Sequence, residues 1–405
     1  MTEHLHLAVA LDGAGWHPAA WRLPDARPGD LFDAAYWVDL AQAAERGGLD
    51  LLTIEDAFTL QSDHPFRPDD RTDQVRGRLD AALVATRIAP ATTHIGLVPT
   101  VTTTHTEPFH VATKVASLDW VSGGRAGWRV QVLRQQAEVD QFGRRVLLDR
   151  SQVASPEDRQ ALSRPLFDEA ADAVEVSRRL WDSWEDDAEI RDRPTGRFID
   201  REKLHHIDFE GEHFSVRGPS ITPRSPQGQP LVVVLAHHVV PYELAARSAD
   251  VVFTTPHDAA GAAAIVAEVR AAEERVGREG RPLLVHADLL VLLEADRGRA
   301  EAARAELDEL DGRAWRSDAE IVATDPEGLA DLLADWQAAG IEGFRLRPAR
   351  LPTDLDAIAD ALVPVLRARG LRPAGYGPGT LRERLGLGRP PSRYAADPHP
   401  ERTPA

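Results

Sequence analysis

Hydroxyl and imidazole side chains gather where the sequence predicts the end of a buried strand. The apolar run that begins at Ile95 leads into Thr100, Thr102, Thr103 and Thr104, and His105 follows directly. Threonine suits strands, but four threonines leading to a histidine exceed what strand propensity requires. Their hydroxyls can donate to carbonyls or accept from ring N–H groups, and histidine can exchange protons near neutral pH. We therefore predict a ligand-binding site at this strand end, with His105 as the proton-exchanging residue.

Two carboxylates, Glu55 and Asp56, follow another predicted strand, Leu49–Ile54. Because side chains alternate along a strand, one carboxylate points into the mouth of a barrel and the other into its wall. Asp56 is either a polar anchor for a cofactor ring, a general base or a cap for the following loop.

Arg129 and Gln131 share one face of a predicted strand, and Trp128 and Val130 share the other. An arginine inside a barrel is costly unless it is paired. The arginine either faces the mouth and binds an anion or contacts an insertion, and we favour the mouth.

The histidines of the chain suggest an alternative hypothesis, a metal-dependent hydrolase in which they bind the metal ion. His4 and His6 share a strand face, and His237, His238 and His257 could supply further ligands. However, the first two stand at the start of their strand, whereas barrel enzymes place their chemistry at the other end. We therefore expect no metal site.

The elements that must position these residues alternate between short apolar runs and helical patterns, which indicates βα units. Eight strands are expected and favour a (β/α)8 barrel: Leu5–Leu11, Leu49–Ile54, Ile95–Val101, Ala126–Val132, Leu231–Leu235, Val251–Thr254, Leu283–Leu293 and Gly343–Leu346. We predict one domain over residues 1–390, with insertions at about 134–164 and 185–229 and a helix from Leu166 to Trp184. A hairpin is expected around Gly211, and the Pro-rich segment 391–405 reads as a mobile tail.

The composition limits the possible functions. The 405 residues carry a formal charge of −18, which opposes binding to nucleic acid or to anionic membranes. The absence of cysteine excludes disulfides, thiolate nucleophiles and Cys-ligated metals. The sequence shows no secretory signal and no apolar stretch of membrane-spanning length, so we expect a cytoplasmic protein.

With these residues placed, the chain resembles the luciferase-like flavin monooxygenase family, and within it the nitrilotriacetate and dibenzothiophene-sulfone monooxygenase branch. The resemblance spans Leu5 to Tyr394 and rests on the order of several segments: YWVDLAQAAERGGLDLLTIEDAF, GLVPTVTTTHTEPFHVATKVASLDWVSGGRAGW, LWDSWEDDA, GEHFSVRGPSITPRSPQGQP and TLRERLGLGRP. It implies a (β/α)8 barrel with insertions and a flavin in its mouth. It also implies that reduced FMN comes from a separate reductase and that O2 is used to oxygenate a small organic substrate. Relatives often form homo-oligomers.

The resemblance places Asp56, Thr100 and Thr103 where relatives carry flavin-site residues. Two segments depart from the family. Arg129 stands where relatives commonly have Asn, and the phosphate-binding loop after the fifth strand reads Leu235–Pro241 in place of a Gly- and Ser-containing loop.

Three readings of these departures stay open. Arg129, His237 and His238 could rebuild an anion site, the coenzyme could be a deazaflavin, or the barrel could be a flavin-less or non-catalytic subunit. We predict that Asp56, Thr100, Thr103, Arg129, His237 and His238 line the flavin.

Overall fold

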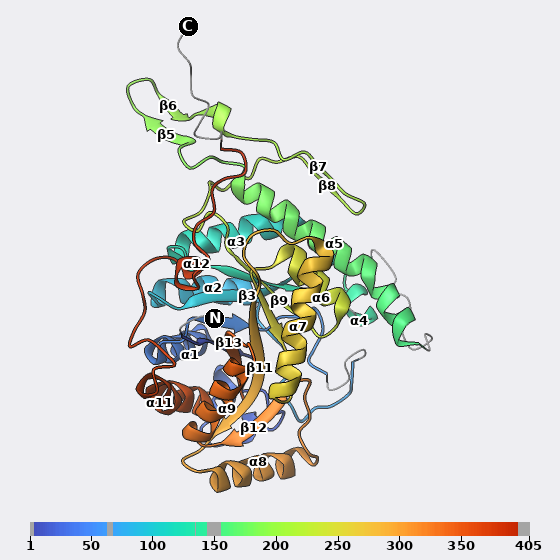
Figure 1. Cartoon of the computed structure of the whole chain (residues 1–405), viewed down its shortest axis with the longest axis vertical. Helices are drawn as coiled ribbons and strands as arrows, with labels where there is room; N and C mark the ends of the chain where they lie inside the picture. Colours follow the sequence, from blue (N-terminus) through green and yellow to red (C-terminus); the bar gives the residue numbers. More distant parts are fainter. Residues whose placement is uncertain (1–3, 63–67, 134, 144–154, 396–405) are drawn as a thin grey trace.

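Eight parallel strands close into a barrel (Figure 1). The computed structural model describes residues 4–62, 68–133, 135–143 and 155–395. Neighbouring strands pair in the order β1, β2, β3, β4, β9, β10, β11 and β13, and β13 pairs with β1 to complete the ring. Their bounds are β1 His6–Leu11, β2 Leu51–Ile54, β3 Gly96–Thr102, β4 Gly127–Gln131, β9 Leu231–Leu235, β10 Val251–Thr254, β11 Leu284–Leu293 and β13 Gly343–Pro348. The predicted (β/α)8 barrel is confirmed.

Helices surround the barrel and bury its outer face (Figure 1). They are α1 Ala34–Gly47, α2 Ala81–Ile88, α3 Pro108–Ser122, α6 Val239–Ser248, α7 Ala259–Val276, α9 Pro326–Ala338, α10 Thr353–Ala357, a π-helical turn Ile358–Leu362 and α11 Val363–Ala368. Short 3-10 turns occupy Ala20–Arg22, Pro28–Asp30, Ala89–Ala91 and Arg201–Lys203. Helix α3 shows how sequence sets these bounds: Pro108 opens it, where the missing N–H costs nothing, and Gly123 ends it with a left-handed φ of 66°.

Two elements in the C-terminal half of the chain were not predicted. Helix α8 spans Arg297–Asp311, and strand β12 spans Glu320–Thr324. Strand β12 pairs with the last five residues of β11, Leu289–Leu293, beyond the section of β11 that pairs with β10. Because α8 is mostly charged and β12 is only half-buried, neither has the strongly apolar pattern on which the prediction relied.

The predicted start of the long helix at Leu166 is wrong. Helix α5 spans Pro156–Asp182 and continues through Pro165, a residue type that usually begins or ends a helix. Within the predicted insertions lie α4 Gln136–Val139, the hairpin of β5 Glu189–Asp192 and β6 Arg197–Ile199, and the hairpin of β7 Phe209–Glu210 and β8 Ser215–Val216. The two hairpins extend away from the barrel beside α5 (Figure 1). The pairing of β7 with β8 confirms the hairpin predicted around Gly211.

The chain after the barrel returns to α5. Helix α12, Leu381–Arg384, begins with a capping box between Thr380 and Glu383. In the segment predicted as a tail, the Ser392 hydroxyl donates to the Asp182 carbonyl and Tyr394 stacks on His205. Residues 396–405 of that segment lie outside the described residues. No helix in the described part of the chain is both long enough and apolar enough to cross a bilayer.

Candidate functional site

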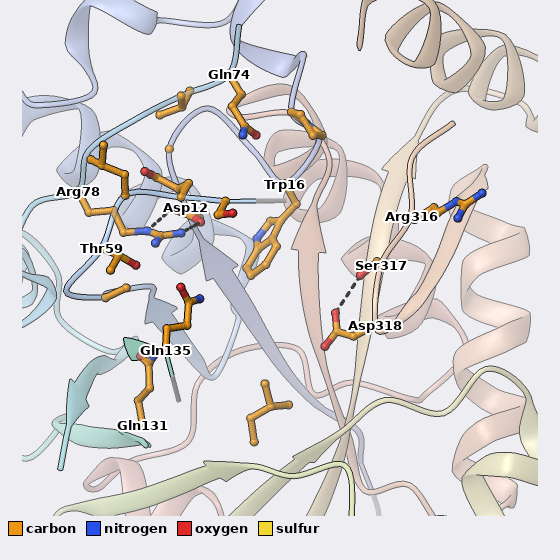
Figure 2. A pocket seen from close by; sticks show the side chains of 18 of the residues that line it. Asp12, Trp16, Thr59, Gln74, Arg78, Gln131, Gln135, Arg316, Ser317 and Asp318 are labelled. Atoms are coloured by element: carbon orange, nitrogen blue, oxygen red, sulfur yellow. Dashed lines mark hydrogen bonds and ion pairs between the residues drawn. The ribbon is translucent and has the colours of Figure 1, made fainter. Parts of the chain in front are cut away.

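A cavity of about 790 Å³ opens at the carboxyl ends of β1, β2, β4 and β9. Its wall includes the segments 12–18, 57–62 and 129–132, and the loop 311–318 between α8 and β12 closes another side. Figure 2 shows side chains from these segments around the space, among them Trp16, Thr59 and Gln131. In (β/α)8 enzymes the active site lies at this end of the barrel, and the volume lies within the usual range for small-molecule sites.

Below the cavity, charged side chains fill the barrel in place of apolar ones. The Arg129 Nη1 donates to Glu55 Oε2 at 2.9 Å and to the Thr100 hydroxyl at 2.8 Å. The other oxygen of Glu55 accepts from Arg345 Nη1 at 3.2 Å. Burial alone would raise the pKa of Glu55, but Arg129 and Arg345 outweigh it and hold this pKa below its usual range. Glu55 is therefore a buried carboxylate that stays ionised at neutral pH.

The same network continues across the barrel from Arg345. Arg345 Nε donates to Asp288 Oδ1 at 2.8 Å, and Arg347 Nε donates to Asp288 Oδ2 at 2.9 Å. Arg347 Nη1 also donates to Asp318 Oδ1 at 2.8 Å. We call the set Arg129, Glu55, Arg345, Asp288, Arg347 and Asp318 the barrel ion network. Its three cations balance its three anions, so the groups compensate one another's burial.

Three buried polar atoms of residues that line the cavity have no hydrogen-bond partner: Gln74 Nε2, Arg129 Nε and Gln131 Oε1. Buried polar groups in folded proteins are nearly always paired, so orphaned ones at a cavity indicate the place of a ligand. Because a glutamine amide can present either its oxygen or its nitrogen, the three side chains can offer both donors and acceptors.

The predicted residues occupy different positions around this cavity. Arg129 and His237 line it. The Thr100 hydroxyl is buried against Arg129, and the Thr103 hydroxyl donates to the Gln131 carbonyl at 3.2 Å. Asp56 points into the wall, where its carboxylate accepts from the backbone N–H groups of Ala57 and Ala81 at the start of α2. Of the two carboxylates that end β2, Glu55 is therefore the one that points into the barrel.

His105 and His238 do not line the cavity. The imidazole of His105 stacks on Phe142 with ring centroids 5.0 Å apart, and its backbone has a left-handed φ of 65°, which is uncommon for a residue other than glycine. His238 is exposed and precedes the first turn of α6. Within the described residues, no three His, Asp or Glu side chains form a group that could hold a metal ion.

Several residues of the cavity wall and of the barrel ion network were not predicted. Asp12 Oδ1 accepts from Arg78 Nε at 3.0 Å, and Figure 2 shows this pair at the cavity wall. Asp12 directly follows the first strand, a position that could have revealed it. Arg345 and Arg347 alternate on the last strand as Arg129 and Gln131 do on β4, so the same rule would have placed them inside the barrel.

The sequence matches the family described as luciferase-like monooxygenase over residues 14–343. The chain belongs to this family. It is 30% identical to the N-acetyl-S-(2-succino)cysteine monooxygenase of Bacillus subtilis strain 168, and the match covers 97% of this chain and 99% of that protein. It is 29% identical to nitrilotriacetate monooxygenase component A of Aminobacter aminovorans, over 97% and 98% of the two chains.

The fold of this luciferase-like monooxygenase agrees with the match. The EDTA monooxygenase of Chelativorans sp. BNC1 superimposes with a TM-score of 0.80 at 24% identity, over 96% of this chain and 99% of that one. The predicted resemblance, including the branch, and the predicted enzyme class of flavin-dependent monooxygenase are confirmed.

The family implies a flavin, and the polar atoms of the cavity match the isoalloxazine ring of that flavin. The pyrimidine edge of an isoalloxazine offers two carbonyl oxygens and an N–H group, which complement orphaned donors and acceptors such as Arg129 Nε and Gln131 Oε1. The volume is large enough to hold a three-ring system together with a small organic molecule. The residues that would hold the pyrimidine edge of the ring are therefore Arg129 and Gln131.

Proposed function

We propose that this luciferase-like monooxygenase is the oxygenase of a two-component system. It receives reduced FMN from a separate reductase and uses O2 to insert one oxygen atom into a small organic substrate. The name of its nitrilotriacetate relative, component A, describes one part of a larger system and supports this arrangement. The cytoplasmic location and the homo-oligomeric state predicted from the sequence remain proposals of the same kind.

The observation that carries the proposal is the cavity with its three orphaned polar atoms. Reduced flavin, when bound, supplies the electrons that activate O2. The chain binds the ring through Arg129 and Gln131, and the barrel ion network holds Arg129 in place from below. Because each charge of that network is paired, it offers no free acid beneath the cavity.

Side-chain contacts join the segments beside the cavity. Arg71 Nη2 donates to Asp311 Oδ1 at 2.5 Å and so joins the segment after β2 to the loop 311–318. Arg22 Nη1 donates to the Leu310 carbonyl at 2.5 Å in the same region. Exclusion of water protects reactive species in an oxygenase site, so these contacts suit the proposed chemistry.

Anaerobic titration with reduced FMN tests the proposal. We expect saturable binding of one flavin per chain by the unmodified protein. Gln131→Leu is expected to weaken binding about tenfold because the ring loses a hydrogen bond. Gln42→Leu, on the exposed face of α1, is the matched control and should bind as the unmodified protein does. If Gln131→Leu binds reduced FMN unchanged, the cavity is not the flavin site.

We retain His105 as the residue that exchanges protons during turnover. It directly follows the predicted ligand-binding end of β3, and its left-handed backbone conformation is of the kind found at functional sites. His105→Gln is expected to lower kcat about 10²-fold, the range for loss of a general acid or base, while the affinity for reduced FMN stays the same. Rapid-mixing assays with reduced FMN and O2 measure the rate. An unchanged kcat would remove His105 from the mechanism.

A further inference from the structure

The cations around the cavity are already neutralised by protein carboxylates. Three of the arginines that line it are each joined to an acid: Arg78 to Asp12, Arg129 to Glu55 and Arg313 to Asp311. A fourth lining arginine, Arg316, is exposed, and its guanidinium extends away from Trp16 and Gln131 (Figure 2). A phosphate group would therefore have to compete with a carboxylate for each inward-facing guanidinium.

Two histidines also line the cavity, and each faces an acid: His17 Nε2 lies 3.2 Å from Asp308 Oδ1. The other is His237. Its Nδ1 lies 2.9 Å from the Thr255 hydroxyl, and its Nε2 lies 3.8 Å from Asp318 Oδ2. Burial would raise the pKa of Asp318, but Arg347 and His237 hold this pKa well below its usual range. The position from which an anion would meet this imidazole thus already holds an ionised carboxylate, which repels a phosphate dianion.

The backbone N–H groups at the start of α6 cannot fully take the place of a free cation as a phosphate-binding site. Pro241, in the first turn, has no N–H, and it is the residue of this turn that lines the cavity. His238 precedes the helix without capping it by its side chain. A helix N-terminus binds phosphate through several converging N–H groups, and here the turn that faces the cavity lacks one of them.

We infer that this enzyme recognises its flavin by the ring and not by the 5′-phosphate, so that it accepts riboflavin, the dephosphorylated flavin, nearly as well as FMN. The inference rests on the proposed function, because it concerns the same site. It follows from a contrast between two parts of the cavity wall. Arg129 and Gln131 on β4 present orphaned polar atoms, whereas His237, in the loop between β9 and α6, already faces an acid.

Parallel anaerobic titrations with reduced FMN and reduced riboflavin test the inference. We expect two dissociation constants that agree within about threefold, a difference well below one hydrogen bond to a charged group. A preference for FMN of about tenfold or more overturns the inference and leaves the proposed function standing. Failure of both flavins to bind overturns the proposed function and the inference with it.

Two variants test which residues make the enzyme indifferent to the 5′-phosphate. His237→Ala should change the dissociation constants of both flavins by the same factor, with the exposed His257→Ala as its matched control. A selective loss of FMN affinity in His237→Ala would show that this imidazole binds the phosphate and would overturn the inference. Asp318→Asn removes the competing carboxylate, so we expect FMN to gain affinity relative to riboflavin. An unchanged ratio would contradict the part assigned to Asp318.

Discussion

Arg129 connects the inside of the barrel to the cavity. One side of its guanidinium donates to Glu55 and Thr100, and its Nε is buried at the cavity without a partner. A single side chain therefore supports the fold and offers a donor to a ligand. The prediction that Arg129 lies at the barrel mouth agrees with its place at the cavity. Its pairing with Glu55 was not predicted, because the sequence indicated Asp56 as the functional carboxylate of the two.

Arg129→Met should destabilise the protein by about 3 kcal/mol, because Glu55 would lose a cation inside the barrel. The folded-state pKa of Glu55 is lowered, so its contribution is present above the unfolded pKa of 4.5 and is lost as the pH falls. The deficit of the variant should therefore be largest at neutral pH. Urea unfolding at pH 7 and at pH 4 measures it, and Arg129→Met with Glu55→Gln should recover part of the loss. Equal stability of Arg129→Met and the unmodified protein would contradict a paired, buried Glu55.

His286 is a second residue with an uncommon environment. It is buried at the opposite end of the barrel from the cavity, stacked on His6 with centroids 5.8 Å apart, and neither ring nitrogen has a hydrogen-bond partner. Burial, together with the nearby His6, lowers the pKa of His286 to about 3. The imidazole is therefore neutral in the folded protein at neutral pH.

This pKa predicts how stability depends on pH. The unfolded chain binds a proton at His286 below its ordinary pKa of 6.5, and the folded chain does not, so stability falls as the pH drops from 6.5 toward 3. The loss should reach about 2 kcal/mol at pH 5. His286→Leu should show a correspondingly shallower pH dependence in urea unfolding between pH 7 and pH 5. The exposed His213→Leu is the control and should keep the full slope, and a His286→Leu variant that also keeps it would refute the assignment.

At the scale of elements, close contact between β11 and β13 shapes the bottom of the barrel. His286 pairs in register with Gly343, and a Cβ on Gly343 would lie 2.6 Å from His286 Nε2. The glycine therefore provides the space that the imidazole occupies, and the two residues are coupled.

Gly343→Ala should cost about 2 kcal/mol of stability, because the methyl group overpacks a closed interior. Gly375→Ala, where a Cβ would meet nothing within 4 Å, is the control and should change stability little. Thermal or urea unfolding of the two variants gives the comparison. If both behave alike, the contact between Gly343 and His286 is not tight.

The loop 311–318 is the second element with a predicted role. The Arg71–Asp311 ion pair joins it to the segment after β2 across the cavity wall. Arg71→Met should make reduced FMN dissociate several-fold faster, because the loop loses its attachment. Stopped-flow measurements of flavin release under anaerobic conditions test this, with Arg27→Met, which breaks the more exposed Arg27–Asp39 pair, as the control. Identical release from both variants would mean that the Arg71–Asp311 pair does not restrict the cavity.

At the scale of the whole molecule, the barrel could be predicted because its strands carry the signal locally. Most barrel strands are short buried runs, such as Leu51–Ile54 or Val251–Thr254, and their apolar pattern is visible without knowledge of their neighbours. Strand β12 could not be found in this way because it packs at the edge of β11 and is half-buried.

The site was harder to predict because its contacts join residues far apart in the sequence. Glu55 and Arg345 meet only because β13 and β2 flank β1 in the closed ring. The sequence identified the strand ends where chemistry is expected, and Arg129 and His237 do line the cavity. It could not show that Arg129 faces Glu55, or that His237 faces Asp318 from the loop before β12, because both pairings depend on the three-dimensional register.

The central claim is that reduced flavin binds in the cavity at the carboxyl end of the barrel. A crystal structure of the enzyme soaked anaerobically with reduced FMN tests it most directly. We predict that the ring lies in the cavity with its pyrimidine edge at Arg129 and Gln131, and that its phosphate makes no ion pair with His237. Flavin density at another place, or a cavity that stays free of flavin at saturating concentration, would contradict the claim.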